Sequence, residues 1–248
     1  MQLKILSFNI RCANDSEGHS IAERAPRVAA ILKNHAADIV GFQEYQFVRW
    51  ADAWAQVEDP AYGEMKIDRS DGEGLVLWWR KDRFALLDQG HFWFADDPAI
   101  PATDWDGKYH KPRICGWLLL QDKKTEKVFL YMNVHYGFGA EGQIKNARLL
   151  ESYAKKIGNY PVIIAGDFNM QPGTPGYTAM AEKFIDVNMA TAKLQENTFH
   201  DYGRNKGKVL DYCFVSDAVT PKSYAILQET FDGKYPSDHY PIEMQLEL

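Results

Sequence analysis

The sequence predicts a protein of the α/β (α+β) class, in which two mixed β-sheets stack on each other and helices cover them, as a four-layer α/β/β/α sandwich. Two observations predict this fold. The 248-residue chain contains many strand-like segments and only a few, dispersed helical ones, and stacked layers are how such elements bury their apolar faces. Several strand segments are almost continuously apolar, which is typical of sheets covered on both faces.

The N-terminal part of the chain begins this pattern. Residues 3–10 alternate apolar and polar side chains and are predicted to form a strand. Residues 21–35 carry apolar side chains every three to four positions, which predicts a helix, and residues 38–42 then predict a second strand.

The remaining elements follow in the same way. Further strands are predicted at residues 74–80, 84–87, 115–121, 128–135, 161–165, 210–216, 224–229 and 242–248, and further helices at residues 143–157 and around residues 175–183. Glycine and proline occur only as short punctuation, and the chain contains no linker or repeat. We therefore expect a single domain over residues 1–248, and a monomer.

The charge balance restricts the class of partner. The chain has 28 basic and 34 acidic residues, for a formal net charge of −6. This balance argues against a protein that holds nucleic acid through a broad basic surface. A phosphorylated substrate remains compatible with it, because bound cations can supply a positive field locally.

The cysteines and the N-terminus predict a compartment. Cys12, Cys115 and Cys213 lie far apart without CxxC spacing, so we expect buried thiols in a reducing environment, not disulfides or a zinc site. No apolar stretch is long enough to span a bilayer, and residues 1–10 do not resemble a signal peptide. A cytoplasmic protein is expected, although a secretion signal removed beforehand would leave no trace.

Polar side chains cluster directly after the predicted strands. In layered folds such strand ends line one crevice, where ligands bind. The residues concerned are Asn9, Glu44, His135, Asp167, Asn169, Asp211, Asp238 and His239.

Each of these residues also has a structural interpretation. Asp167 and Asn169 share a face if the strand continues, but an Asx-rich turn closing the strand is equally compatible. Asp238 and His239 lie between two prolines and could form a rigid turn. Asn9 and Glu44, taken singly, are most simply capped or solvated strand ends.

Taken together, six short segments in order resemble the endonuclease/exonuclease/phosphatase superfamily over nearly the whole chain. They are Ser7-Phe-Asn-Ile-Arg11, Gly41-Phe-Gln-Glu44, Asn133-Val-His135, Gly166-Asp-Phe-Asn169, Leu210-Asp-Tyr-Cys-Phe-Val-Ser216 and Ser237-Asp-His-Tyr-Pro241. Within the superfamily the pattern is most similar to pancreatic DNase, through Glu73-Gly-Leu-Val-Leu-Trp-Trp-Arg80 and Pro112-Arg-Ile-Cys-Gly-Trp117.

The resemblance implies a role for each residue. Glu73 would orient His135, Asp211 would orient His239, and Arg113 would contact the substrate phosphate, which Arg11 could also approach. Glu44 would bind a metal ion, with Asn9 and Asp238 as further ligands and with Asp167 and Asn169 in or near the ion site.

These residue types suit phosphate-ester hydrolysis. Mg²⁺, or Mn²⁺ as the alternative, prefers carboxylate and amide oxygens. We expect in-line attack by a water activated at Asp167 or at a histidine, with the metal ion stabilising charge in the transition state. The substrate would be a nucleic acid, a small phosphorylated molecule or a lipid headgroup.

Three functional classes stay open. A phosphodiesterase or nuclease-like enzyme is favoured over a phosphomonoesterase that acts on a sugar, inositol or lipid phosphate. A non-catalytic protein that binds a phosphorylated ligand or a protein is the third alternative. We expect residues 95–111 to form a rim loop in which Trp105 shapes specificity, and Tyr136 and Phe138 to be candidates for packing on the substrate.

Overall fold

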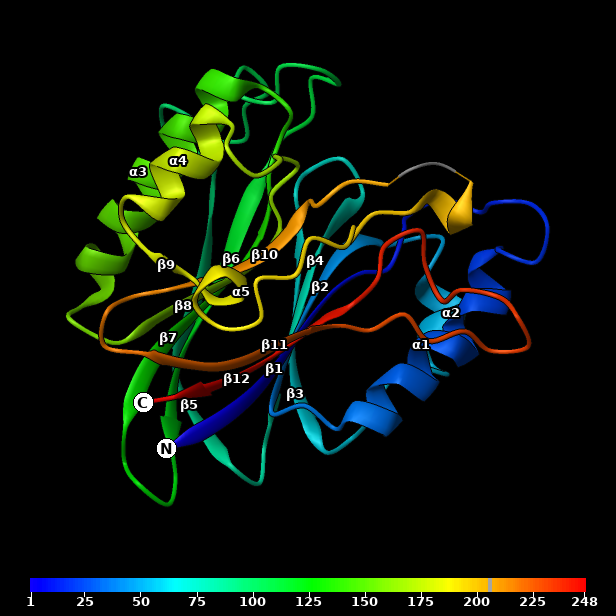
Figure 1. The fold of residues 1–248 in the computed structure, drawn as a ribbon, viewed down its shortest axis with the longest axis horizontal. Helices are drawn as coiled ribbons and strands as arrows, with labels where there is room; N and C mark the ends of the chain where they lie inside the picture. The colour runs from blue at the N-terminus through cyan, green and yellow to red at the C-terminus, as the bar shows by residue number, and fades with distance from the viewer. Residues whose placement is uncertain (205–206) are drawn as a thin grey trace.

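Two six-stranded sheets face each other, and helices cover their outer sides (Figure 1). The computed structural model describes residues 1–204 and 207–248. One sheet has the strand order β11-β12-β1-β2-β4-β3 and the other β5-β6-β7-β8-β10-β9. Each is mixed, because β1 pairs with β2, and β7 with β8, in parallel, while the other pairs are antiparallel. The predicted four-layer α/β/β/α sandwich is confirmed.

The bounds of the elements follow the chain. The strands are β1 (Gln2–Asn9), β2 (Ile39–Gln46), β3 (Tyr62–Asp68), β4 (Glu73–Arg80), β5 (Phe84–Trp93), β6 (Ile114–Asp122), β7 (Val128–His135), β8 (Val162–Asp167), β9 (Ile185–Asp186), β10 (Asp211–Val215), β11 (Thr220–Ile226) and β12 (Ile242–Glu247). The helices are α1 (Ile21–His35), α2 (Ala51–Trp54), α3 (Ala140–Ile157), α4 (Pro175–Ala181), α5 (Val187–Ala190) and the 3₁₀ turn η1 (Asp201–Gly203).

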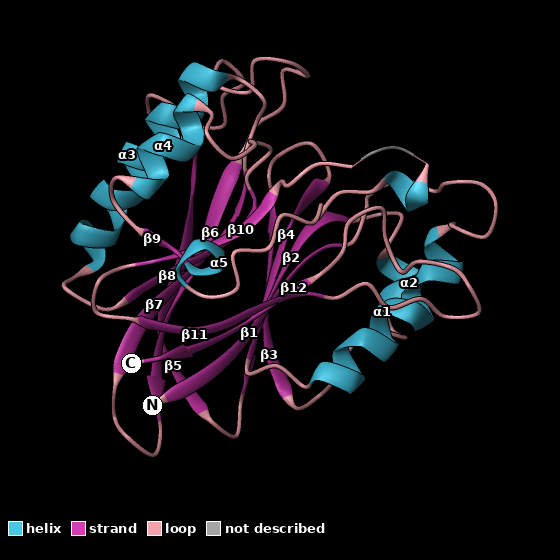
Figure 2. Cartoon of the chain, viewed as in Figure 1, coloured by secondary structure: helices cyan, strands magenta, loops and turns pink. Residues whose placement is uncertain are grey.

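Three apolar clusters hold the layers together. The central cluster lies between the sheets and includes Ile5 and Leu77 from one sheet and Leu118 and Ile163 from the other. A second cluster joins α3 and α4 to the sheet that contains β7 and β8. A third joins α1 and α2 to the sheet that contains β1 and β2 (Figure 2). Burial of one large apolar side chain contributes about 1.5–3 kcal/mol, so these clusters provide most of the stabilisation.

The structure differs from the sequence prediction mainly at sheet edges. β3 was not predicted, because only one of its residues, Ile67, is fully buried and the segment lacks an apolar run. β5 continues to Trp93, beyond the predicted end at residue 87, through a register shift after Leu86. The strand predicted at residues 224–229 lies at Thr220–Ile226.

Strand pairing brings together the strand ends that carry the candidate site residues. The carboxyl ends of β1, β2, β7 and β8 and the amino ends of β4, β6 and β10 lie at one edge of the sandwich, because antiparallel neighbours run in opposite directions. Among helices of the described residues, none combines the length and apolarity needed to cross a membrane. Cys12, Cys115 and Cys213 are free thiols, and Cys12 is only half-buried.

Candidate functional site

A cleft of about 560 Å³ opens at this edge of the sandwich, a volume typical of sites for small ligands. Nine of the residues singled out in the sequence line it. They are Arg11, Glu44, Glu73, Arg113, His135, Asp167, Asn169, Asp238 and His239. The other two, Asn9 and Asp211, are buried directly behind the cleft wall and contact lining residues.

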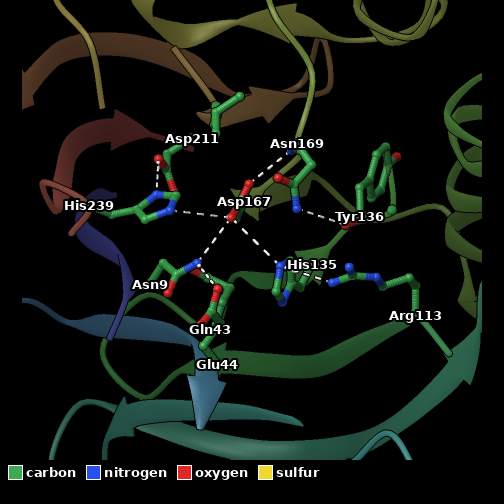
Figure 3. Close-up of polar contacts among 12 residues, drawn as sticks. Asn9, Gln43, Glu44, Arg113, His135, Tyr136, Asp167, Asn169, Asp211 and His239 are labelled. Carbon is green, nitrogen blue, oxygen red and sulfur yellow. Dashed lines mark hydrogen bonds and ion pairs between the residues drawn. The ribbon is translucent and has the colours of Figure 1, made fainter. Parts of the chain in front are cut away.

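Asp167 lies at the centre of the arrangement (Figure 3). It ends β8, where its register partners are His135 on β7 and Asp211 on β10. Its Oδ2 accepts a hydrogen bond from Asn9 Nδ2 at 3.0 Å and lies 3.7 Å from His135 Nε2 and 3.8 Å from His239 Nε2. Strand pairing therefore brings His135 and Asp211 beside Asp167, and His239 reaches the same carboxylate from the segment before β12.

His239 forms a buried pair with Asp211. Its Nδ1 lies 2.9 Å from Asp211 Oδ2. Burial would lower the pKa of His239, but the charge of Asp211 and this hydrogen bond outweigh it and raise the pKa to about 10. The ring is therefore protonated on both nitrogens at neutral pH, and its Nε2–H is directed toward Asp167.

His135 is in the opposite state. Arg113 donates a hydrogen bond from Nη1 to His135 Nε2 at 3.0 Å, and a guanidinium has only donors, so this nitrogen carries no proton. Burial and the charge of Arg113 hold the pKa of His135 well below its ordinary value. The ring is thus neutral, with its proton on Nδ1 facing Glu73 Oε1 at 3.7 Å.

Glu73 therefore lies beside His135, and its expected role in orienting that ring stays a prediction. At 3.7 Å the two groups are in contact but not hydrogen-bonded. Glu73 instead pairs with Arg69, whose Nη1 lies 2.6 Å from Glu73 Oε1. Burial and the neighbouring charge of Glu44 raise the pKa of Glu73 to about 7.

Glu44 projects into the cleft from an irregularity in β2. The β2–β4 register shifts between Phe42 and Tyr45, and Glu44 adopts a φ of 63°. Such bulges redirect side chains, and non-glycine residues with positive φ cluster at functional sites. The oxygens of Glu44 accept hydrogen bonds from Asn9 Nδ2 at 3.1 Å and from the Cys12 N–H at 2.9 Å.

Arg11 lies between two acidic side chains of this group. Its guanidinium is 3.9 Å from Glu44 and 3.5 Å from Asp238, and it also pairs with Asp15 at 3.1 Å. Burial would raise the pKa of Glu44, but nearby positive charge and the Cys12 N–H bring it below its usual range. With His135 neutral, Arg11 provides that charge, and Glu44 stays ionised.

Buried carboxylates outnumber the cations that neutralise them at the centre of the site. Burial and the charge of Asp211 raise the pKa of Asp167 to about 7, and burial together with Glu44 raises that of Asp238. Such crowding of oxygen donors is the environment that a hard divalent cation stabilises. Glu44 and Asp238, with the Asn9 amide between Glu44 and Asp167, fit such an ion.

Asp167, Asp211 and His239 form another cluster whose potential ligand atoms lie within 4.8 Å of one another. A protonated imidazole has no free lone pair to offer a metal ion. This cluster therefore fits the ion less well than the group around Glu44.

Asn169 supports Asp167 from the loop after β8. Its backbone N–H donates to Asp167 Oδ1 at 2.8 Å, and its side-chain amide donates to the Tyr136 carbonyl at 3.0 Å. Asn169 has a φ of 47°, which turns the chain sharply after the strand. The Asx turn that the sequence allowed is therefore present, and the same hydrogen bond supports the Asp167 carboxylate in the cleft.

Two aromatic expectations are wrong. Trp105 does not line the cleft but packs beside α3, with Lys145 Nζ 5.2 Å from its ring centre. Tyr136 is fully buried, and its hydroxyl donates to the Met180 sulfur. Phe138 does line the cleft, next to Tyr109.

Several cleft residues were not identified individually in the sequence, although Lys108 and Lys111 fall in the predicted rim loop of residues 95–111. Arg69, Lys108, Lys111 and Lys208 line the cleft, and Asp106 binds Arg113 from behind. They lie on irregular loops, where no periodic pattern marks them. An arginine or lysine two residues from an aspartate, as in Arg69 and Asp71, is too common to identify a site.

The comparisons with known proteins show the family and the fold. The model of the endonuclease/exonuclease/phosphatase family matches residues 6–239. The structure of an endonuclease/exonuclease/phosphatase from Bacteroides vulgatus is similar, with a TM-score of 0.89, 30% identity and coverage of 100% of this chain and 99% of that one.

Two further proteins are similar. A mannosyl-6-phosphatase of Bacteroides thetaiotaomicron has a TM-score of 0.89 at 28% identity, covering 99% of this chain and 100% of that one. Carbon catabolite repressor protein 4 homolog 3 of Arabidopsis thaliana is 26% identical over 159 residues, which are 60% of this chain and 33% of the plant protein. This chain thus matches about a third of the plant protein's length.

Proposed function

The chain belongs to the endonuclease/exonuclease/phosphatase family, and on that premise we propose that it is a divalent-metal-dependent hydrolase of phosphate esters. The observation that carries the proposal is the arrangement around Asp167. Its Oδ2 lies within 3.8 Å of Nε2 of both His135 and His239, and Arg113 contacts His135, in a cleft of small-molecule size.

Asp167 and His239 have complementary tasks in this proposal. Asp167 orients the attacking water and accepts its proton, for which a pKa of about 7 is well matched to neutral pH. As the water oxygen bonds to phosphorus, the bond from phosphorus to the ester oxygen breaks, and the leaving alkoxide takes a proton from solvent. The Nε2–H of His239 donates to a non-bridging phosphoryl oxygen as negative charge develops there, and Asp211 keeps the ring charged and correctly oriented.

Arg113 and His135 act from the opposite side of Asp167. The Arg113 guanidinium binds a second phosphoryl oxygen through charge-assisted hydrogen bonds. The neutral His135 accepts from Arg113 and thereby directs the guanidinium toward the cleft. Arg11 provides further positive charge beside Glu44 and Asp238, near the substrate phosphate.

Glu44, Asp238 and Asn9 would hold the metal ion, Mg²⁺ or Mn²⁺. Carboxylate and amide oxygens are hard donors, and burial together with the charge of Glu44 raises the pKa of Asp238, so the site chemistry fits a divalent cation. The chemistry that such an ion supplies when bound is neutralisation of charge on the phosphoryl oxygens. Asn169 keeps Asp167 in place beside it.

We favour a phosphodiester substrate, and a phosphomonoester is the second candidate. The similarity to a mannosyl-6-phosphatase over almost the entire length of both chains supports the second candidate. The free cleft volume of about 560 Å³ accommodates a sugar phosphate or a mononucleotide-sized diester equally well.

Hydrolysis of bis-p-nitrophenyl phosphate and of p-nitrophenyl phosphate, with Mg²⁺, Mn²⁺ or EDTA, tests the proposal. We expect turnover that requires a divalent ion, and the preferred ester separates a diesterase from a monoesterase. A protein that hydrolyses neither ester with either metal would contradict the proposal and favour the third class, a non-catalytic ligand-binding member of the family.

A further inference from the structure

Asp106 is a buried carboxylate that the roles assigned above do not use. It lies between β5 and β6, and its side chain is fully inaccessible to solvent. Its Oδ1 accepts a hydrogen bond from Arg113 Nε at 2.8 Å, and its Oδ2 accepts one from the Tyr109 N–H at 2.6 Å. A carboxylate this deeply buried costs stability unless it is paired and hydrogen-bonded, and both of its oxygens are.

The bond to Nε fixes the direction of the Arg113 side chain. The guanidinium is planar, so holding Nε by Asp106 and Nη1 by His135 Nε2, at 3.0 Å, sets the plane of the whole group. The remaining N–H groups of Arg113 then point toward the cleft that the residue lines. Arg113 is itself only 4% exposed, so its side chain has little room to adopt other orientations.

The backbone of Asp106 also positions the opposite wall segment. Its carbonyl accepts hydrogen bonds from the N–H groups of Phe138 and Gly139, each at 2.7 Å. The Phe138 ring lies 5.7 Å from the Arg113 guanidinium carbon. One residue thus determines the positions of the arginine and of the aromatic side chain beside it.

The chain approaches itself closely enough here that only glycine fits. A Cβ on Gly137 would lie 2.5 Å from the Asp106 Cα, and one on Gly107 would lie 2.5 Å from the Gly139 Cα. Gly107 also has a φ of 75°, which disfavours other residues. These contacts keep Asp106 and the start of α3 together as one rigid unit.

We propose that Asp106 is a positioning residue, which fixes the Arg113 guanidinium against His135 so that it meets the substrate phosphate in a pre-set orientation. The proposal rests on the proposed function for Arg113 as a phosphate ligand. Preorganised donors need no reorientation during the reaction, and misplacement of such a group by about 1 Å can cost roughly 100-fold in rate.

The charge of Asp106 is consistent with this arrangement. Burial alone would raise its pKa, but the adjacent Arg113 guanidinium more than offsets burial and lowers it. Asp106 is therefore ionised throughout the neutral range. Replacement by the isosteric asparagine removes the charge and leaves the volume almost unchanged.

The chain contains a matched control in Asp122. That carboxylate is also buried, accepts a hydrogen bond from an arginine Nε (Arg83, 3.1 Å) and caps a turn by accepting the N–H three residues on (Thr125, 2.8 Å). It stands at the far end of β6, about 30 Å along the strand from Arg113. Asp122→Asn therefore reproduces the structural loss without touching the cleft.

The experiment compares Asp106→Asn, Asp122→Asn, Arg113→Ala and the double variant Asp106→Asn/Arg113→Ala. We expect Asp106→Asn to lower kcat/KM by at least ~10-fold and up to ~100-fold, Asp122→Asn to leave it within about twofold, and the double variant to lose little beyond Arg113→Ala. Both aspartate variants are expected to lower Tm. Asp106→Glu, which keeps the charge but displaces it by one methylene, serves if the asparagine variant does not fold.

A second readout does not depend on turnover. Side-chain ¹⁵N NMR reports which His135 nitrogen carries the proton, and the nitrogen that accepts from Arg113 must be unprotonated. We expect Asp106→Asn and Arg113→Ala to move the proton from Nδ1 toward Nε2, and Asp122→Asn to leave it on Nδ1.

The outcomes separate the two proposals. An Asp106→Asn protein with wild-type kcat/KM and an unchanged His135 tautomer would overturn the positioning role. If the wild type showed no hydrolysis at all, the proposed function would fail, while the NMR comparison would still decide whether Asp106 places Arg113.

Discussion

The two histidines of the cleft differ in protonation because of their immediate neighbours. His239 faces the carboxylate of Asp211 at 2.9 Å and is held as an imidazolium. His135 faces the Arg113 guanidinium at 3.0 Å and is held neutral. Paired groups whose environments drive their pKa values apart are typical of acid–base sites.

Replacement of Asp211 by asparagine tests the His239 state. The amide retains the volume but not the charge, so the pKa of His239 should fall and the ring should become neutral near pH 7. Because a neutral ring is a weaker donor to the phosphoryl oxygen, we expect kcat for p-nitrophenyl phosphate to fall by ~100-fold or more. An unchanged kcat would show that the His239 charge plays no part in turnover.

The raised pKa of Asp167 predicts a pH dependence of stability in the metal-free protein. An unfolded aspartate titrates near ~4, whereas burial and the charge of Asp211 raise the pKa of Asp167 to about 7 in the folded state. The folded protein then binds more protons than the unfolded chain between these values, so this residue costs stability as pH rises from about 4 to about 7.

Thermal unfolding in EDTA at pH 5 and pH 8 measures this cost. Asp167→Asn cannot ionise, so we expect its Tm to increase relative to that of the wild type between pH 5 and pH 8. If the Tm difference between the two proteins were the same at both pH values, the raised pKa of Asp167 would be contradicted.

At this scale, sequence reasoning located Asn9, His135 and Asp167 because each ends a largely apolar strand, whereas Asp211 begins β10 and Asp238 and His239 precede β12. It could not locate Asp106 or Arg69, whose partners Arg113 and Glu73 are reached through loop conformation and not through strand register. It placed Glu73 beside His135, where the structure has it at 3.7 Å, but it did not identify Arg69, which lies closer to Glu73, since spacing alone does not reveal a competing cation.

Among the elements, the central strands were predictable and the edges were not. β1, β7 and β8 are almost wholly buried, and the alternating pattern of β1 and the apolar runs of β7 and β8 predict them. β3 and the second half of β5 are half-exposed edge segments, whose polar residues hide the strand period. The bulge in β2 that aims Glu44 into the cleft also has no signature in sequence.

The loop between β5 and β6 contains two aromatic residues with different surroundings. Trp105 packs beside α3, where a Cβ on Gly142 would lie 2.1 Å from its carbonyl oxygen, whereas Tyr109 lines the cleft. We expect Trp105→Ala to destabilise the protein by ~1–3 kcal/mol and to leave the ratio of diester to monoester hydrolysis unchanged. Tyr109→Ala should change that ratio with little effect on Tm.

Urea unfolding and steady-state assays on both variants measure these effects. A Trp105→Ala protein with native Tm and an altered substrate ratio would restore the expectation that Trp105 shapes specificity. It would also contradict the packing role described here.

For the whole molecule, the two sheets share one core. The central cluster takes residues from both sheets, and Gln43 of one sheet donates to Asn133 of the other at 2.7 Å in the interior. Neither sheet can expose its inner face without exposing that of its partner. We therefore propose that residues 1–248 form a single domain and that the protein is a monomer.

Equilibrium unfolding in urea tests this proposal. Tryptophan fluorescence and far-ultraviolet circular dichroism should report one coincident transition, with a midpoint that is independent of protein concentration. Two separated transitions would indicate that the sheets are independent units, and a concentration-dependent midpoint would indicate an oligomer.

The fold class could thus be predicted from the strand and helix pattern. The family could be predicted because six short segments match its pattern in order over most of the chain. The loop-borne cations that line the cleft could not be predicted, because no periodic pattern marks them. Neither the strand pattern nor the family therefore identifies the substrate.

The most direct test of the site is the metal-dependent hydrolysis of p-nitrophenyl phosphate and its bis-ester by wild type, Asp167→Ala and His239→Ala. We expect the wild type to turn over at least one ester with Mg²⁺ or Mn²⁺, and each variant to lose that activity by ~100-fold or more while remaining folded. Full hydrolysis by both variants would contradict the account, because the reaction would then not depend on the residues at the centre of the cleft.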